Sequence, residues 1–473
     1  MINKSFLLQA FLSASAFKIL LFPAYRSTDF HVHRHWKAVT RTLPIHEWYY
    51  DNEHVDTVHT VDYPPSFLYM EYIWANNPLT EFLIQNGVIE PECLQLLSDD
   101  QVGDYNGIGG SIQLSQGCVA FLRSTVVLSD AGLWWGASVV APTASSFFLL
   151  VANPAFLWID HVHFQYNGIL LGLLLASIGF LRRANEEESH RDHLIGAALF
   201  ALLLTFKHLY LVLAPWYFVY LLRRYCTSWQ NFGRLALAVG PVLLLPFVPF
   251  RSCLPRLLER MFPFGRGLVH DYWAGNVWAI FMAIKKVVPQ LPEPSPLQVA
   301  TLLLVALIPS LIGAWNAAAR RDNNLLVLSL SYSGLAAFMF AYHVHEKAIL
   351  TSLIPLTLIG GRWFRRMSVY GLLGLFPLLF LKTELLLKLV SYVGFIGWVY
   401  SLPEDKTTPS RVARWIDGLL GLPLIPAVAI LILEMIPLST WGRLEFLPLA
   451  LTSLIVALGL ISVYVEMLLE VLS

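Results

Sequence analysis

Long apolar runs recur along this chain, and each is about as long as a bilayer is thick. Short polar or basic segments separate them. Such runs predict transmembrane helices, because a helix pairs its own backbone polar groups inside lipid. The candidate spans are residues 6–25, 116–138, 142–159, 168–182, 193–207, 209–222, 234–250, 299–318, 325–342, 346–360, 368–381, 385–401, 421–438 and 446–468. The pattern therefore predicts an all-α polytopic membrane protein with roughly 11–14 transmembrane helices.

Composition agrees with this fold class. Of the 473 residues, 56% are hydrophobic and 14% are charged, and the mean hydropathy is +0.59. A soluble domain carries about 25% charged residues. Lys+Arg and Asp+Glu number 32 each, so no charge excess indicates a nucleic-acid partner. We expect the lipid bilayer as a partner, no nucleic acid, and a single multi-span membrane domain over residues 1–473.

Basic residues predict the orientation of the helices. The first apolar run is too long for a signal peptide and lacks a good cleavage site, so we take it as an uncleaved helix that leaves the N-terminus in the cytosol. Alternating the helices places four basic clusters in the cytosol, as the positive-inside rule requires. These are Arg182-Arg183, Arg223-Arg224, Arg320-Arg321 and Arg362 with Arg365 and Arg366. The polar loops 26–115, 160–167, 251–298 and 343–346 then share the opposite face.

The loop 26–115 is rich in Trp and Tyr, which favour the membrane–water interface. We expect short amphipathic helices there, lying along the membrane. Residues 95–115 contain several glycines and read as a flexible connector. Residues 251–298 form the second long loop on the same face.

The stretch 25–36 is the strongest candidate for chemistry. It holds Asp29, three histidines and two arginines directly after the first apolar run. Charged groups near a membrane are costly unless they are used. Asp29 is therefore our candidate for a catalytic base, although its charge could instead balance Arg26 or Arg34.

Other polar motifs lie between the apolar runs. In Asp62-Tyr63-Pro64-Pro65 the prolines stiffen the chain, which would aim Asp62 and Tyr63 or simply form an interfacial turn. Arg123 and Asp130 are two helical turns apart on one face, and we expect them to make structural contacts with other helices. Further polar groups are His161, His163, Gln165 and Asn167 in one loop, Arg266 between glycines in another, and His343, His345 and Lys347 in a third.

Cysteine and histidine patterns give weak evidence for a metal. Cys93, Cys118, Cys226 and Cys253 have no CxxC spacing, so we predict neither a disulfide framework nor a structural zinc site. His-Val-His occurs at 31–33, 161–163 and 343–345. In an extended segment both histidines would face one way and could bind zinc, but no further ligand spacing accompanies them.

Together these motifs resemble the dolichyl-phosphate-glucose-dependent α-1,3-glucosyltransferases of the endoplasmic reticulum, glycosyltransferase family 57. The resemblance rests on segments 27–36, 43–50, 61–65, 160–167, 262–268 and 343–347. It implies the glycosyltransferase C-type fold, with a long lumenal first loop that carries interfacial helices. It also implies a multi-pass protein of the endoplasmic reticulum membrane with a lumenal active site, no metal and no cofactor.

One branch of this family adds the first glucose to the lipid-linked Man9GlcNAc2 oligosaccharide, and the other adds the second. Segments Ser27-Thr28, Asn167-Gly168, 207–210 and 270–276 resemble the second branch. The resemblance thus implies glucose transfer from dolichyl-phosphate-glucose to dolichyl-diphosphate-linked Glc1Man9GlcNAc2. The first-glucose enzyme is the alternative. A lipid transporter or scramblase and a zinc-dependent membrane hydrolase are more remote ones.

The resemblance also assigns roles to residues. A β-linked donor that gives an α-glucoside implies inversion with one base, for which Asp29 is the candidate. The candidates for the donor phosphate or sugar are Arg266, His343, His345, Lys347, His161 and His163. The candidates for the acceptor side and its loops are Arg34, Trp36, Asp62, Tyr63, Gln165 and Asn167.

Overall fold

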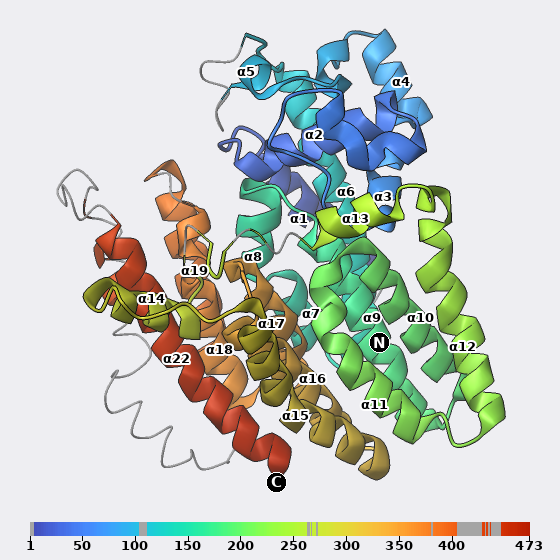
Figure 1. The fold of residues 1–473 in the computed structure, drawn as a ribbon, viewed down its shortest axis with the longest axis vertical. Coiled ribbons are helices and arrows are strands. Elements are labelled where there is room, and N and C mark those ends of the chain that lie inside the picture. The colour runs from blue at the N-terminus through green and yellow to red at the C-terminus, as the bar shows by residue number, and fades with distance from the viewer. Residues whose placement is uncertain are drawn as a thin grey trace. The chain divides into compact units, whose positions relative to one another are not determined.

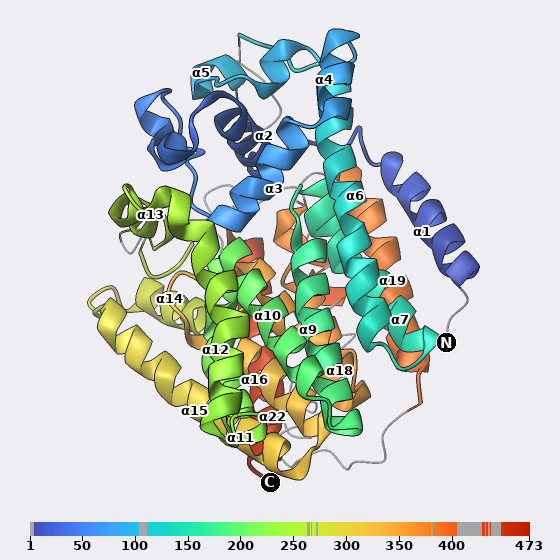
Figure 2. The ribbon, with the colours of Figure 1, turned by 90° about the vertical axis from the view of Figure 1, so that its right-hand side faces the viewer.

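In a computed structural model of the chain, every regular element among the described residues is a helix. The structure describes residues 4–103, 111–262, 265, 267–270, 273–379, 382–403, 428–430, 432–433, 436 and 446–473. These form two compact units (Figures 1 and 2). Unit 1 holds Met1–Ala184, His190–Leu211 and Gln230–Pro263, and unit 2 holds Asn185–Ser189, Val212–Trp229 and Phe264–Ser473. The prediction of an all-α polytopic membrane protein is confirmed, and the single domain stays a prediction.

Among the described residues, six helical segments are long and apolar enough to cross a membrane. They are Ala144–Val162, Asn167–Glu187, Trp229–Phe250, Pro296–Arg320, Asn323–Phe340 and Leu447–Leu472. Shorter apolar helices cover Ser5–Ile19 and Leu385–Ser401. The predicted span 421–438 lies largely outside the described residues. The predicted total of 11–14 helices stays a prediction.

The long helices of unit 1 pack through small residues. They are α1 (Lys4–Ile19), α6 (Gln116–Val140), α7 (Ala144–Val151), α9 (Asn167–Glu187), α10 (His190–Phe206) and α12 (Trp229–Leu244). Gly132 and Gly136 of α6 face Gly172 of α9, and a side chain at either position of α6 would collide with the partner helix. Glycines four residues apart let two backbones approach closely, as is common in membrane helix pairs. This contact fixes α6 against α9.

A lobe of short helices covers one end of these long helices. It contains α2 (Thr28–Thr42), α3 (Pro65–Ala75), α4 (Pro78–Gln85), α5 (Asp99–Val102) and α13 (Leu254–Met261), with 3₁₀ segments at Ile45–Glu53, Pro91–Leu94 and Leu245–Phe250. Figures 1 and 2 both show the lobe around the end at which α6 begins. Its core is aromatic and includes Trp36, Trp48, Tyr49 and Phe67. That the lobe's helices lie along the membrane stays a prediction.

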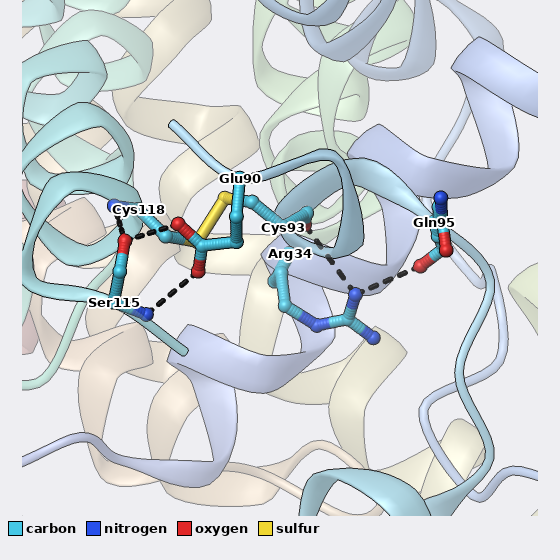
Figure 3. The surroundings of a disulfide bond; sticks show 6 residues. All are labelled: Arg34, Glu90, Cys93, Gln95, Ser115 and Cys118. Carbon is cyan, nitrogen blue, oxygen red and sulfur yellow. Dashed lines mark hydrogen bonds between the residues drawn. A yellow bond between two sulfur atoms is a disulfide. The ribbon is translucent and has the colours of Figure 1, made fainter. Parts of the chain in front are cut away.

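A disulfide ties this lobe to α6. Cys93, in the 3₁₀ segment before α5, is bonded to Cys118 in the first turn of α6 (Figure 3). Beside it, Glu90 accepts a hydrogen bond of 2.6 Å from the backbone N–H of Ser115, and Ser115 caps α6. The expectation of no disulfide was wrong. The two cysteines meet only because the lobe folds back onto α6, which their spacing in the sequence does not reveal.

Unit 2 is built around a hairpin of two long helices. These are α15 (Pro296–Arg320) and α16 (Asn323–Phe340), joined at Asp322, whose carboxylate accepts from the backbone N–H groups of Asn324 and Leu325. The other helices are α11 (Ala214–Arg224), α14 (Val277–Val287), α17 (Leu350–Leu356), α18 (Gly361–Leu373), α19 (Leu385–Ser401) and α22 (Leu447–Leu472). Glu466 of α22 forms a buried ion pair of 2.5 Å with Arg366 of α18.

Within each unit, basic turns and polar motifs lie at opposite helix ends. In unit 1 the lobe adjoins the start of α6, whereas Arg182 donates to the carbonyl of Val140 at the other end of that helix. In unit 2, Arg321 is at the start of α16 and pairs with Glu188, and His343 follows its end. This arrangement fits the predicted sorting of basic and polar loops onto two faces.

We predict that separate replacement of Cys93 and Cys118 by Ser will destabilise the lobe. Closing a loop of about this length stabilises a protein by roughly 3 to 4 kcal/mol. The lobe should then be cut faster by protease and the melting temperature should fall, while Cys226→Ser serves as the control. Denatured wild-type protein should expose only Cys226 and Cys253 to a thiol reagent until it is reduced. Labelling of all the cysteines without reduction would contradict the disulfide.

Candidate active site

Asp29 lies in the first turn of α2, at the end of this helix that is accessible to solvent. Ser27 caps the helix and accepts a hydrogen bond of 3.3 Å from the N–H of Phe30. A carboxylate is stabilised in the first turn by the positive end of the helix dipole. The Asp29 side chain is 21% exposed, whereas the helix from Phe30 to Thr40 is almost entirely buried. The carboxylate is thus held by a rigid element and is still open to a ligand.

Two side chains from one turn contact Asp29. Its Oδ2 atom lies 3.1 Å from Nε2 of His163 and accepts a hydrogen bond of 2.6 Å from the amide of Gln165. Arg34, one of the two alternative partners, instead donates to the carbonyls of Cys93 and Gln95 (Figure 3). Asp29 is therefore built into a polar site whose partners come from a distant part of the chain.

An unusual backbone conformation brings His163 and Gln165 to the same carboxylate. The π-helical segment Leu157–Val162 ends just before them, and Phe164 has a φ of 77°. A bulky residue rarely adopts positive φ, and it costs about 1–3 kcal/mol unless the surroundings enforce it. Here the buried Phe164 ring packs 5.1 Å from Phe30 and 5.9 Å from Tyr166, measured between ring centroids. Aromatic packing therefore holds the turn that presents both partners of Asp29.

Arg123 of α6 forms hydrogen bonds with both segments of the site, the one before Asp29 and the one before His163. Its Nη2 atom donates to the carbonyl of Tyr25 at 2.8 Å and to that of Ala24 at 3.2 Å. Its Nη1 atom donates to the carbonyls of His161 and Val162. The side chain is buried, so these carbonyls depend on the guanidinium for their hydrogen bonds. The expected contact of Arg123 with another helix is confirmed, and its structural role stays a prediction.

Asp130, two turns further along α6, binds another pair of side chains. Its Oδ2 atom lies 2.5 Å from Nζ of Lys18 and 2.9 Å from Nε2 of His161. All three groups are buried, and a charge in the protein interior is stable only when an opposite charge pairs with it. The expected contacts of Asp130 with other helices are confirmed. The predicted role of His161 toward the donor stays a prediction.

A buried polar network lies behind Asp29. Glu71 of α3 is 2.5 Å from the Lys37 ammonium and 2.9 Å from Nδ1 of His33. Lys37 also donates to the hydroxyl of Tyr166, which is hydrogen-bonded to Thr125 of α6. Burial alone would raise the pKa of Glu71, but the Lys37 charge and the hydrogen bond with His33 hold it below its usual value. This network joins α2, α3 and α6 and locks the helix that carries Asp29.

Tyr63 reaches the same site through Gln165. The pKa of Tyr63 is raised well above its usual value by burial and by the Asp62 and Asp29 charges, and its side chain is hydrogen-bonded to Gln165. Lys207 lies 4.9 Å from the centre of the Tyr63 ring. Asp62, beside it, is partly exposed. The loop before Pro64 therefore adjoins the carboxylate.

Two other predicted acceptor residues serve the framework of unit 1. Trp36 is buried and donates from Nε1 to the carbonyl of His59 at 3.0 Å. The side-chain amide of Asn167 donates to Asp160 at 2.9 Å, and Asp160 also accepts from the backbone at the start of α9. Their predicted contact with the acceptor, like that of Arg34, stays a prediction.

In unit 2 the predicted donor residues form a histidine cluster. The rings of His343 and His345 lie 5.6 Å apart, and both adjoin His270, with centroid distances of 5.8 and 4.4 Å. Lys347 follows in the 3₁₀ turn Glu346–Ile349. Arg266 lies outside the described residues. His270 was not among the predicted site residues, because nothing in the sequence showed that its loop meets residues 343–345.

The metal hypothesis gains no support from the described residues. No three His, Cys, Asp or Glu side chains among them could hold a metal ion together. His31 and His33 lie in the helix α2, and His161 lies in the π-helical segment that ends at Val162. These pairs are therefore not in the extended conformation that would aim both histidines the same way.

Comparison with known proteins identifies similar chains. A model of the ALG6, ALG8 glycosyltransferase family matches residues 14–467. Three similar proteins carry the name dolichyl pyrophosphate Glc1Man9GlcNAc2 alpha-1,3-glucosyltransferase. The one from Gibberella zeae is 34% identical over 97% of both chains. That from Arabidopsis thaliana is 32% identical over 100% of this chain and 99% of its own. That from Mus musculus is 33% identical over 95% and 92%.

We predict that His33 makes the stability of unit 1 depend on pH. Burial lowers the pKa of folded His33 below the usual value of 6.5, despite the favourable charge of Glu71. As the pH falls, the unfolded chain therefore takes up the proton first, and stability that is complete above about pH 6.5 is lost below it. The melting temperature should fall less steeply toward about pH 5 in His33→Asn than in wild type.

The exposed His46 provides the control, as His46→Asn. A slope that is identical in wild type, His33→Asn and His46→Asn would refute the assignment to His33.

Proposed function

This chain belongs to the ALG6, ALG8 glycosyltransferase family, and we propose that it is the α-1,3-glucosyltransferase that adds the second glucose. It moves glucose from dolichyl-phosphate-glucose to lipid-linked Glc1Man9GlcNAc2. The observation that carries this proposal is near-complete coverage by relatives of that name at about one-third identity. The contacts of His163 and Gln165 with the Asp29 carboxylate are the structural support for this proposal.

The chemistry requires one base. The acceptor hydroxyl attacks C1 of the donor glucose while the bond from C1 to the phosphate oxygen breaks, which inverts the β-linked donor to an α-glucoside. The hydroxyl loses its proton in the same step, and a single carboxylate is enough to take it. Hydrolases that need both an acid and a base use two carboxylates instead. A phosphate leaving group needs charge stabilisation more than it needs a proton.

Asp29 has the properties of that base. It lies on a buried helix, at an end accessible to solvent, and two side chains fix the direction of its carboxylate. Fixed geometry of this kind can contribute several powers of ten to a rate, because the reacting groups need no further search. Tyr63 adjoins it through Gln165, Asp62 directly precedes Tyr63, and we propose that both line the acceptor side.

The donor phosphate is assigned to unit 2. His343, His345 and Lys347 are polar or cationic groups in one short segment, and the Lys347 charge together with hydrogen bonds from the two imidazoles would stabilise the developing phosphate anion. Arg266 remains a further candidate on sequence grounds. His163, in contrast, contacts Asp29, which supports a role beside the base.

We place the lobe and the site in the lumen of the endoplasmic reticulum. The disulfide between Cys93 and Cys118 supports this placement, because such bonds persist in oxidising compartments and are rare in the cytosol. The basic turns at the opposite helix ends support it independently.

We predict that Asp29→Asn abolishes glucose transfer in a folded protein. Asn keeps the shape of the carboxylate but cannot take a proton, and loss of a general base lowers the rate about 100- to 10,000-fold. The measurement is single-turnover transfer from dolichyl-phosphate-glucose to lipid-linked Glc1Man9GlcNAc2 and, in parallel, to Man9GlcNAc2. Wild type should prefer the first acceptor.

The matched control is Asp56→Asn, at an exposed aspartate of the same lobe, which should transfer glucose like wild type. Preference for Man9GlcNAc2 would identify the first-glucose enzyme instead. Near-normal transfer by folded Asp29→Asn protein would remove Asp29 from the mechanism and make Asp62 the next carboxylate to test.

A further inference from the structure

Tyr25, His163 and Asp29 contact one another in that order, and we call these three side chains the relay. The hydroxyl of Tyr25 lies 3.1 Å from Nδ1 of His163, and Nε2 of the same ring lies 3.1 Å from Oδ2 of Asp29. Tyr25 is buried, His163 is 14% exposed at its side chain, and Asp29 is 21% exposed. These three side chains therefore extend from the protein interior to the partly exposed carboxylate of Asp29.

His163 contacts Asp29 through Nε2 and Tyr25 through Nδ1, and the protonation of one nitrogen decides the hydrogen-bonding role of the other. An ionised carboxylate only accepts hydrogen bonds, so the nitrogen that lies 3.1 Å from Oδ2 of Asp29 is the one that carries the proton. In the neutral ring the other nitrogen, Nδ1, is then an acceptor, and the Tyr25 hydroxyl is the donor that satisfies it. The tautomer of a histidine is set by the hydrogen bond at its second nitrogen. Tyr25 thus selects the form of His163 that donates to Asp29.

We propose that Tyr25 and His163 are positioning residues for the glucosyl transfer, with Tyr25 acting on Asp29 through His163. This proposal rests on the proposed function and adds to it. His163 keeps the carboxylate turned toward the acceptor hydroxyl, and Tyr25 keeps His163 in the donating tautomer. Neither residue exchanges a proton with substrate. The proton that leaves the acceptor goes to Asp29.

The backbone around the three residues supports the assignment. Arg123 binds the carbonyl of Tyr25 and those of His161 and Val162, so it fixes the backbone at Tyr25 and directly before His163. Ser27, between Tyr25 and Asp29, donates from its hydroxyl to the carbonyl of His163. Gln165 adds a second donor at Oδ2. These contacts of Arg123, Ser27 and Gln165 therefore fix the positions of Tyr25, His163 and Asp29 relative to one another.

The test measures kcat and KM for both substrates in Tyr25→Phe, His163→Gln, His163→Phe and the double variant Tyr25→Phe with His163→Phe. Phe at position 25 keeps the ring and removes only the hydroxyl. Gln at position 163 places an amide donor near the site of Nε2, whereas Phe places none. Tyr72→Phe, at an exposed tyrosine, and His46→Gln, at an exposed histidine, are the matched controls.

We expect Tyr25→Phe to lower kcat about 2- to 10-fold, the range of one ordinary hydrogen bond, with KM unchanged. His163→Phe should lower kcat about 100-fold, as misplacement of a catalytic group does. His163→Gln should recover most of that loss. In the His163→Phe background, Tyr25→Phe should cause no further loss, because its effect passes through the imidazole.

Three results would overturn the relay. The first is wild-type kcat in both Tyr25→Phe and His163→Phe. The second is an equal loss from Tyr25→Phe in both backgrounds, which indicates packing alone. The third is a change confined to KM or to the melting temperature. Wild-type transfer and the Asp29→Asn result are measured on the same preparations, so a failure of the relay is distinguishable from a failure of the proposed function.

Discussion

The site depends on one buried guanidinium. Arg123 binds carbonyl oxygens on both sides of the carboxylate site, before Asp29 in one segment and before His163 in the other. Neither segment can bond these carbonyls to its own helix, because each lies where a helix ends or has not yet begun. A buried carbonyl without a partner costs about 1–3 kcal/mol. Losing the guanidinium would therefore release both segments together and separate Asp29 from His163 and Gln165.

The lobe explains how a polar helix can carry the carboxylate that we propose as the base. Helix α2 buries Arg34 and Lys37, and a helix of this length would be marginal alone in water. It is stable here because each buried charge has partners: Lys37 and His33 bind Glu71, and Arg34 binds two carbonyls beside the disulfide. Breaking one buried partner would leave an uncompensated charge, which is far more costly than losing a surface ion pair. Rigidity at Asp29 thus follows from charge pairing behind it.

The sequence predicts the long helices well, because their apolar length is set by the bilayer. Span 385–401 agrees with α19 at both ends, and 116–138 agrees with α6 to within two residues. Local crowding also points to Asp29, whose contacts with His163 and Gln165 the structure shows, while its role as the base stays a prediction. The disulfide and the contact of His270 with His345 were missed, since both join segments through the tertiary fold. His161 and His163 were assigned one role, but the π-helix and the positive φ of Phe164 direct one to Asp130 and the other to Asp29.

We argue that Arg123 holds the two segments of the site together. The most direct test is the kcat of an Arg123→Lys variant, measured beside its melting temperature. Lysine keeps the charge, but its point-like ammonium cannot reach both groups of carbonyls as the planar guanidinium does. We predict a folded protein whose kcat is lower by about 100-fold, as expected when the base is displaced by an ångström. Arg191→Lys, at an exposed arginine of the same unit, should behave like wild type. A folded Arg123→Lys protein with wild-type kcat would contradict the account.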